Sequence, residues 1–163
     1  MVRLERLGAD HADALLAFET ENREYFARSV PDRGDAYFAG FAARHRALLA
    51  EQDAGACRFH VIVDDLGDLV GRVNLVDIAD GAAELGYRVA RRAAGRGTAT
   101  AALREVCRLA AGAYGLDVLT AVTTRDNGAS RAVLARTGFT VVEDVLLDGR
   151  PGARYRRRLS APL

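Results

Sequence analysis

The sequence predicts an α/β fold in which a single mixed, mostly antiparallel sheet is flanked by helices on both faces. Strand-like runs in the middle of the chain are joined by short turns, and such connections link antiparallel neighbours. Further on, a strand-like run, an amphipathic segment and another strand-like run follow one another, which is the order of a right-handed crossover between parallel strands. The 163 residues are expected to form one domain, residues 1–163, with a substantial core.

Composition and charge narrow the class of protein. Half of the residues are hydrophobic and 28% are charged, as in an ordinary globular domain. The net charge of +1 creates no field that attracts nucleic acid or a membrane surface, so neither is expected as a partner. No apolar run approaches the ~18 residues of a membrane span, and the first residues lack the apolar core of a signal peptide, so we expect a cytoplasmic protein. Cys57 and Cys107 lack the spacing of a disulfide framework or a metal site, which predicts buried thiols and no metal.

The first part of the chain predicts a strand, a helix and a connector. Val2–Leu7 alternates imperfectly between apolar and charged residues, which indicates a short strand. A helix is expected from Asp10 to Asn22. Residues 23–34 are polar and contain Pro31 and Gly34, which is typical of a loop or a broken helix.

The next segment, from Asp35 to about Gln52, is expected to be a helix that ends at Gly55. Its aromatic and leucine side chains recur at helical spacing. His45 lies on that apolar stripe, so we interpret it as a packed histidine and not as a catalytic one.

Three strands are expected next, because each apolar run is bounded by turn residues. They are Cys57–Val63, Leu69–Ile78 and Ala82–Ala90. The turns between them are rich in aspartate and glycine, which favours hairpins between antiparallel neighbours.

A glycine-containing turn separates the third of these strands from a helix expected over Thr98–Ala113. Gly95 and Gly97 let the backbone turn tightly and approach a ligand closely. The unpaired N–H groups of the following first helical turn lie at the positive end of the helix dipole, where a phosphate or pyrophosphate binds well. An ordinary strand–helix connection is the alternative interpretation.

The last part of the chain predicts a strand, a helix and two strands. Leu116–Thr124 is apolar on both faces and is expected to be buried and parallel to the strand before the glycine turn. A helix is expected over Asn127–Thr137, followed by strands at Phe139–Leu147 and Ala153–Leu159. The final strand is rich in arginine, and we expect it at an exposed edge where charge prevents aggregation.

Four sequence blocks together resemble the GNAT superfamily of acetyl-CoA-dependent N-acetyltransferases. They are Glu84-Leu-Gly-Tyr-Arg-Val, Arg92-x-x-Gly95-x-Gly97, Asn127-Gly-Ala-Ser130 and Gly138-Phe139. The resemblance covers Cys57 to Val145 and implies the GNAT fold with acetyl-CoA as co-substrate. The first half, with Glu21-Asn22-Arg23 and Pro31, resembles the Rim-type subgroup, which acetylates the N-terminal amine of ribosomal proteins and has relatives with other substrates.

The resemblance implies a set of residues that bind the acetyl donor. Backbone groups of Tyr87 to Val89 would pair with the pantetheine amides, and N–H groups from Ala93 to Ala99 would surround the pyrophosphate. Asn127 would bind the pantetheine arm or cap its own helix, and the two roles can coexist. The expected donor-binding residues are Tyr87, Val89, Arg91, Arg92, Gly95, Arg96, Gly97, Thr98, Ala99 and Asn127.

Thioester aminolysis needs a neutral amine and a proton for the leaving thiolate. Deprotonation at pH 7 costs about 4.6 kcal/mol for a lysine amine but about 1 kcal/mol for an α-amine, so a modest base serves an α-amine. Glu84 is the leading candidate for that base, followed by Glu143 and then Asp77. The alternative interpretation of Glu84 is a solvent-facing strand carboxylate with no part in catalysis. Ser130 stands where Rim-type enzymes have a serine proposed to protonate the thiolate. The alternative is that Ser130 is a surface residue of the helix without a catalytic role.

The expected reaction is acetyl transfer to a primary amine, foremost a peptide or protein N-terminal α-amine. A small amine such as a polyamine, amino acid or antibiotic is one alternative. A non-catalytic acyl-CoA sensor is the other, and it would need the glycine turn but neither Glu84 nor Ser130. Arg88 stands where the family usually has an aromatic residue, a departure that favours an acidic or polar acceptor. Exposed strand edges are compatible with a homodimer.

Overall fold

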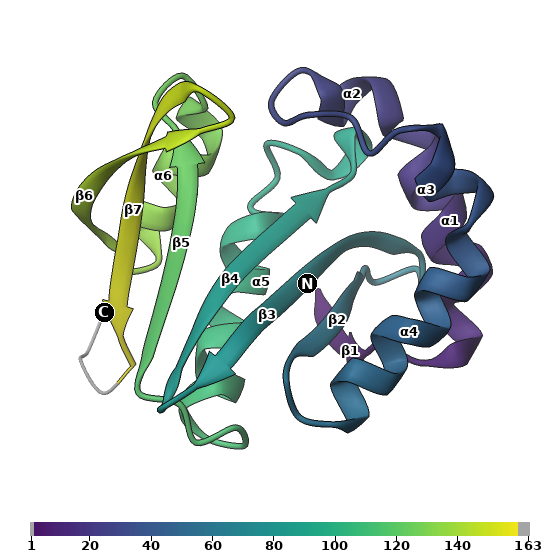
Figure 1. Cartoon of the computed structure of the whole chain (residues 1–163), viewed down its shortest axis with the longest axis horizontal. Helices are drawn as coiled ribbons and strands as arrows, with labels where there is room; N and C mark the ends of the chain where they lie inside the picture. Colours follow the sequence, from purple (N-terminus) through teal and green to yellow (C-terminus); the bar gives the residue numbers. More distant parts are fainter. Residues whose placement is uncertain (1, 160–163) are drawn as a thin grey trace.

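The computed structural model describes residues 2–159, which form a seven-stranded sheet in the order β1-β2-β3-β4-β5-β7-β6 (Figure 1). Adjacent strands are antiparallel except β4 and β5, which are parallel. The predicted mixed, mostly antiparallel sheet is therefore confirmed. The strands are β1 (Arg3–Arg6), β2 (Arg58–Val63), β3 (Leu69–Ala79), β4 (Ala82–Val89), β5 (Val118–Thr124), β6 (Thr140–Leu147) and β7 (Arg150–Arg158).

Helices cover both faces of this sheet. The helices are α1 (Ala12–Glu21), α2 (Arg23–Ala27), α3 (Asp35–Ala39), α4 (Phe41–Asp53), α5 (Thr98–Ala111) and α6 (Gly128–Arg136), with short 3₁₀ turns η1 (Ala9–His11) and η2 (Arg91–Ala93). On one face, α1, α2 and α4 bury aromatic and leucine side chains against β2. No helix of the described residues is long and apolar enough to cross a membrane.

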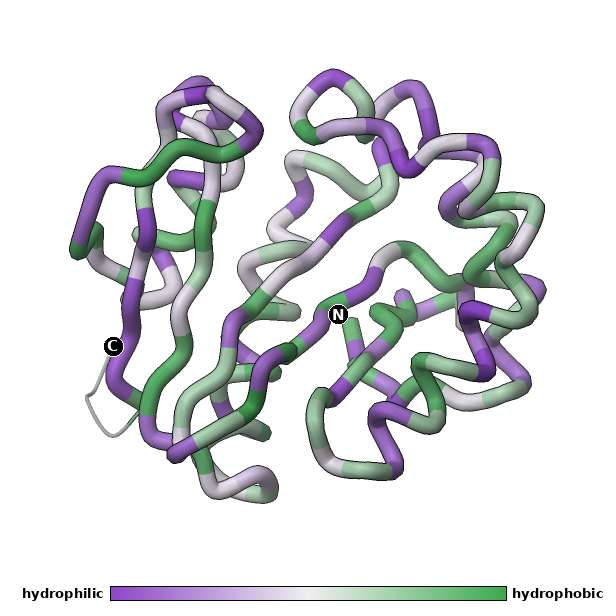
Figure 2. Tube along the Cα trace, viewed as in Figure 1, coloured by the Kyte–Doolittle hydropathy of each residue, from purple (hydrophilic) through white to green (hydrophobic). Residues whose placement is uncertain are grey.

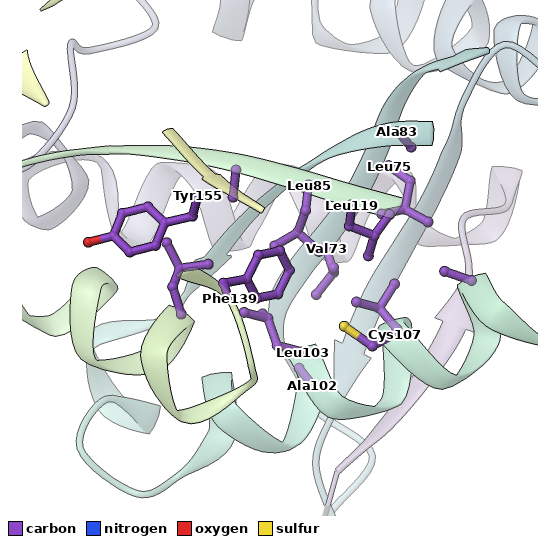
Figure 3. Packing of buried hydrophobic residues seen from close by; sticks show 14 of the residues in the cluster. Val73, Leu75, Ala83, Leu85, Ala102, Leu103, Cys107, Leu119, Phe139 and Tyr155 are labelled. Atoms are coloured by element: carbon purple, nitrogen blue, oxygen red, sulfur yellow. The ribbon is translucent and has the colours of Figure 1, made fainter. Parts of the chain in front are cut away.

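The other face carries the larger core, beneath α5. The strong amphipathic pattern of α5 places its apolar stripe on β3, β4 and β5, as Figure 3 shows. Residues that form the centre of this core are Val73, Leu75, Leu85, Ala102, Leu103, Val106, Cys107 and Leu119. The buried residues of α5 run from Ala102 to Ala110, so the helix packs on the sheet through its middle and last turns. Its first turn, from Thr98 to Ala101, stays partly or fully exposed beyond the end of β4.

The parallel pair β4–β5 is short. Ala82–Glu84 pair with Val118–Thr120, and beyond Glu84 the two strands diverge (Figure 1). Leu85–Val89 therefore pair with β3 on one side and have no β5 partner on the other. This divergence, here named the β4–β5 opening, exposes strand edges in the middle of the sheet.

The expectation that the arginine-rich final strand lies at the sheet edge is wrong. Asp148 and Gly149 adopt φ values of 50° and 78°, which form a tight hairpin turn and fold β7 back between β6 and β5. Within β7, Arg154 and Arg156 share one face and Tyr155 is buried on the other. Figure 2 shows the resulting hydrophilic stretch beside the C-terminus. The strand at this edge is β6.

Two further expectations need correction. The helix expected over residues 35–52 is two helices, because the chain is interrupted at Gly40. The strand expected to be buried on both faces alternates, since Thr120 and Val122 are half-buried whereas Leu119 and Ala121 are buried. The connector at residues 23–34, expected as a loop or a broken helix, begins with the short helix α2. The burial of His45 and of both free cysteines is confirmed.

Candidate active site

The glycine turn has the backbone shape that the sequence predicts. Gly95 and Gly97 have φ values of 72° and 78°, in the left-handed region that side chains disfavour. A Cβ at either position would meet no atom within 4 Å, so the backbone conformation and not crowding requires glycine. The first hydrogen bond into α5 runs from the N–H of Ala101 to the carbonyl of Gly97, which leaves the N–H groups of Thr98 and Ala99 ahead of the helical ladder.

The expected row of N–H groups from Ala93 to Ala99 is shorter than predicted. Because Arg91–Ala93 form a 3₁₀ turn, the Ala93 N–H donates to the Ala90 carbonyl at 2.9 Å. The Ala94 N–H donates to the Arg91 carbonyl at 3.1 Å. The groups available to an anion therefore begin at Gly95.

Three arginines surround this turn with exposed side chains. Arg91 and Arg96 are exposed, and the guanidinium of Arg91 lies 5.9 Å from the ring centre of Tyr25. Arg92 lies 3.9 Å from a carboxylate oxygen of Asp64, a long contact in which both groups reach solvent. All three guanidiniums therefore lie near the turn and reach solvent, and their bonding to a phosphate stays a prediction.

A buried asparagine that the sequence analysis assigned no role holds the turn from behind. The side-chain oxygen of Asn22 accepts a hydrogen bond from the N–H of Arg91 at 3.0 Å. Its amide donates to the carbonyl of Phe18 at 2.9 Å. Asn22 thereby joins the end of α1 to the start of the glycine turn. The signal in the sequence is an amide residue at the end of a helix.

Two hydroxyl groups meet across the β4–β5 opening. The hydroxyl of Tyr87, on β4, donates to the hydroxyl of Ser130, on α6, at 3.3 Å. Burial raises the pKa of Tyr87 more than the bond to Ser130 lowers it, so the phenol keeps its proton at neutral pH. Asn127 caps α6, and its side-chain oxygen accepts from the Ser130 N–H at 3.2 Å. The cap role left open for Asn127 is therefore observed, and it fixes Ser130 at the opening.

The two leading carboxylates share one arginine. Arg154, on β7, lies 3.5 Å from Glu84 and donates from Nε to Glu143 at 2.8 Å. Glu84 is 36% exposed and faces the side of the sheet away from α5. Asp77 lies in the bulge that follows the Val76–Glu84 pair, with φ of 53°.

The three histidines of the chain are engaged elsewhere. His11 contacts Glu5, and His45 contacts the carbonyl of Gly8 at 2.9 Å. His60 contacts the carbonyl of Val73 and the hydroxyl of Tyr114, and burial lowers its pKa. A carboxylate is therefore the better candidate for a base at the opening.

A buried ion cluster lies farther along β3 and β4, on the same face as Glu84. Glu19 of α1 is 1% exposed, and its carboxylate lies 3.0 Å from Arg72, 3.2 Å from Arg33 and 3.3 Å from Arg88. Arg72 and Arg88 are direct partners in the β3–β4 register. This cluster was not predicted from the sequence. Its signal there is Glu19, a glutamate four residues after Leu15 on a buried helical stripe.

One pocket lies outside the opening. It has a volume of about 310 Å³ and lies between the β2–β3 turn and the outer side of the glycine turn. Both aspartates and arginines line it, and Tyr87 and Ser130 do not, so we assign it no part in catalysis. Its lining residues are Val2, Asp64, Asp65, Leu66, Val70, Arg92, Ala93, Arg96 and Thr98.

A family model described as an acetyltransferase (GNAT) domain matches residues 2–140. The chain belongs to the GNAT acetyltransferase family, and it is an N-acetyltransferase with acetyl-CoA as co-substrate. None of the curated proteins compared with the chain matches it. Within the described residues, no cluster of side chains that could hold a metal ion is present.

Solved structures that are similar to this chain support its resemblance to the Rim-type subgroup. The ribosomal-protein-S5-alanine acetyltransferase from Vibrio fischeri has a TM-score of 0.89 at 20% identity, covering 98% of this chain and 93% of that one. RimJ of Mycobacterium smegmatis, in complex with CoA-disulfide, has a TM-score of 0.87 at 26% identity, covering 96% and 81%. Spermidine N-acetyltransferase from Vibrio cholerae, in complex with CoA and spermine, has a TM-score of 0.81 at 16% identity, covering 98% and 96%. The Rim-type resemblance is confirmed, whereas these likenesses leave the acceptor class open.

The glycine turn yields a test of donor binding. We expect Gly95→Glu to weaken acetyl-CoA binding at least about a hundredfold in calorimetry, because a carboxylate would repel the pyrophosphate at close range. Gly55→Glu is the matched control, since Gly55 also has positive φ and open space around its Cα but ends α4. Equal loss of affinity in both variants would mean that backbone strain alone, and not the anion site, explains the effect.

Proposed function

We propose that this protein transfers the acetyl group of acetyl-CoA to the N-terminal α-amine of a peptide or protein, in a ternary complex. The observation that carries the proposal is the pairing of Glu84 with Arg154 at the β4–β5 opening. The contact with Arg154 holds the Glu84 carboxylate at the opening. A carboxylate is a weak base, and an α-amine, unlike a lysine amine, needs only a weak base at neutral pH.

The charge of the acceptor face argues against a polyamine. Arg33, Arg72 and Arg88 outnumber the one carboxylate that they contact. A polyamine carries several positive charges, and this face would repel it. The Rim-type resemblance, to which the likeness to RimJ at 26% identity belongs, also favours the peptide α-amine.

The residues of the chain divide the work between donor and acceptor. The unpaired edge of β4 beyond Glu84 fits the amides of the pantetheine arm, and the N–H groups from Gly95 onward fit its pyrophosphate. Acetyl-CoA supplies the activated acyl group. Glu84 accepts the proton of the attacking amine, directly or through water, and Ser130 donates a proton to the departing sulfur.

Transfer is direct, because no cysteine nucleophile lies at the opening. Cys57 and Cys107 are free and buried in the two cores. Burial raises the pKa of both thiols, which keeps them protonated. Their free state also supports placing the protein in the cytoplasm.

A thiol-release assay over a panel of acceptors tests the proposal. Peptides with a free α-amine should react at least about a hundredfold faster than the same peptides acetylated at the N-terminus and carrying an internal lysine, since fewer lysine amines are neutral. Faster turnover of spermidine or of the blocked lysine peptide would contradict the proposed acceptor. Binding of acetyl-CoA without release of thiol from any acceptor would identify a sensor domain instead.

The role of Glu84 has its own test. Glu84→Gln should lower kcat/KM for a peptide about tenfold between pH 6 and 9, because the proton acceptor is lost while the shape is kept. Full activity over that range would exclude Glu84 as the base. Glu143→Gln is the comparison, and a larger loss there would assign the role to Glu143.

Ser130 is tested by separating kcat from KM. Ser130→Ala should lower kcat about tenfold and change the KM for acetyl-CoA less than about twofold, because the hydroxyl acts on the leaving thiolate. The reverse pattern, a raised KM with unchanged kcat, would assign Ser130 to donor binding. Tyr87→Phe removes the hydroxyl that donates to Ser130. The double variant of Tyr87→Phe and Ser130→Ala should therefore have a kcat close to that of Ser130→Ala alone.

A further inference from the structure

We propose that the acceptor peptide carries an acidic side chain close to its N-terminal amine, and that Arg33, Arg72 and Arg88 bind that side chain. This inference rests on the proposed function, because it names the kind of peptide that the same site takes.

The cluster around Glu19 carries more positive than negative charge. Its three guanidiniums contact one carboxylate, which leaves two positive charges in excess. An ion cluster that served packing alone would be stabilised by matched charges, since unbalanced buried charge is costly. The imbalance therefore points to a second anion that comes from outside the chain.

Acidic side chains near Arg33 in sequence do not supply that anion. Asp32 and Asp35 both accept from Arg23, each at 2.8 Å. The bond from Arg23 lowers the pKa of Asp32 to about 2, so this pair is kept together. It anchors the loop from which Arg33 extends.

Two donors within the cluster are buried and unused. The Nε groups of Arg72 and Arg33 have no hydrogen-bond partner among the described residues. Arg72 is 5% exposed, so its unpaired N–H has little access to solvent. A buried donor without a partner is costly, and a carboxylate beside these groups would satisfy it.

Mutual repulsion of the arginines gives the same indication. Burial lowers the pKa of Arg88, and the nearby charges of Arg33 and Arg72 lower it further against the opposing effect of Glu19. An added negative charge would relieve this repulsion. The guanidiniums are also pre-oriented, because Arg88 lies over the ring of Phe26 at 4.9 Å and Arg33 over that of Tyr37 at 4.6 Å.

The distance from the β4–β5 opening suits a peptide. Arg88 lies two residues beyond Gly86 and four beyond Glu84 on the same face of β4, which is roughly 7 and 13 Å along the strand. Gly86 is exposed and has no atom within 4 Å of where a Cβ would lie, so the path between is open. An extended peptide advances about 3.5 Å per residue. An amine at Glu84 therefore brings the second to fourth side chains within reach of the arginines.

The test compares two peptides that differ in charge and not in shape, beginning Ala-Asp-Asp-Asp and Ala-Asn-Asn-Asn. At low salt, kcat/KM for the acidic peptide should exceed that for the amide peptide about tenfold, and the ratio should fall as salt screens the charges. Arg33→Gln should reduce the ratio to about two, and Arg33→Lys should restore most of it. Arg33 is chosen because, at 25% side-chain exposure, it is the least buried of the three arginines.

Arg46→Gln is the control, since it removes one exposed charge from α4 and should leave the ratio unchanged. Calorimetry of the CoA-loaded protein with both peptides measures the same preference without turnover. A preference in binding without thiol release would reject the proposed function and support the acidic ligand. Equal kcat/KM for the two peptides, an equal loss on both in Arg33→Gln, or a higher rate with free aspartate than with the acidic peptide would overturn the inference.

Discussion

The separation of β4 from β5 after three residue pairs is the constraint on which the site depends. Up to Glu84 the sheet is continuous, and from Leu85 onward the β5 side of β4 is an edge in the middle of the fold. Backbone N–H and C=O groups at such an edge require partners, and a ligand with amides of its own satisfies them as a strand would. The same divergence sets the span that Tyr87 and Ser130 bridge, and it leaves Glu84 at the point where the strands part.

In the proposed function, different kinds of group recognise the two substrates. The proposed donor site is built from backbone: glycines with positive φ, the first turn of α5 and the unpaired edge of β4. The proposed acceptor site is built from side chains that meet around Glu19 and come from α1, the loop before α3, β3 and β4. Asn22 connects the two sites, because it closes α1 and holds the N–H of Arg91.

This division also explains which features the sequence could predict. The glycine turn, the apolar stripe of α5 and the cap at Asn127 could be predicted, because the residues that form each lie within one turn or one helix. The position of β7 depends on contacts between distant segments, namely the turn at Asp148 and the pairing with β5. Its arginines are typical of an edge strand, although β7 lies inside the sheet. Glu19 and Arg72 are 53 residues apart, and their pairing required the fold. The shared contact of Glu84 and Glu143 with Arg154 was hidden for the same reason.

Amide hydrogen exchange with and without CoA tests the central claim, that the β4 edge and the glycine turn together form the donor site. Bound CoA should protect alternate amides of Leu85–Val89, together with those from Gly95 to Thr100, because these groups gain hydrogen-bond partners. Residues 64–66 at the neighbouring pocket should be unaffected. Protection confined to residues 64–66, with no change along β4, would contradict the account.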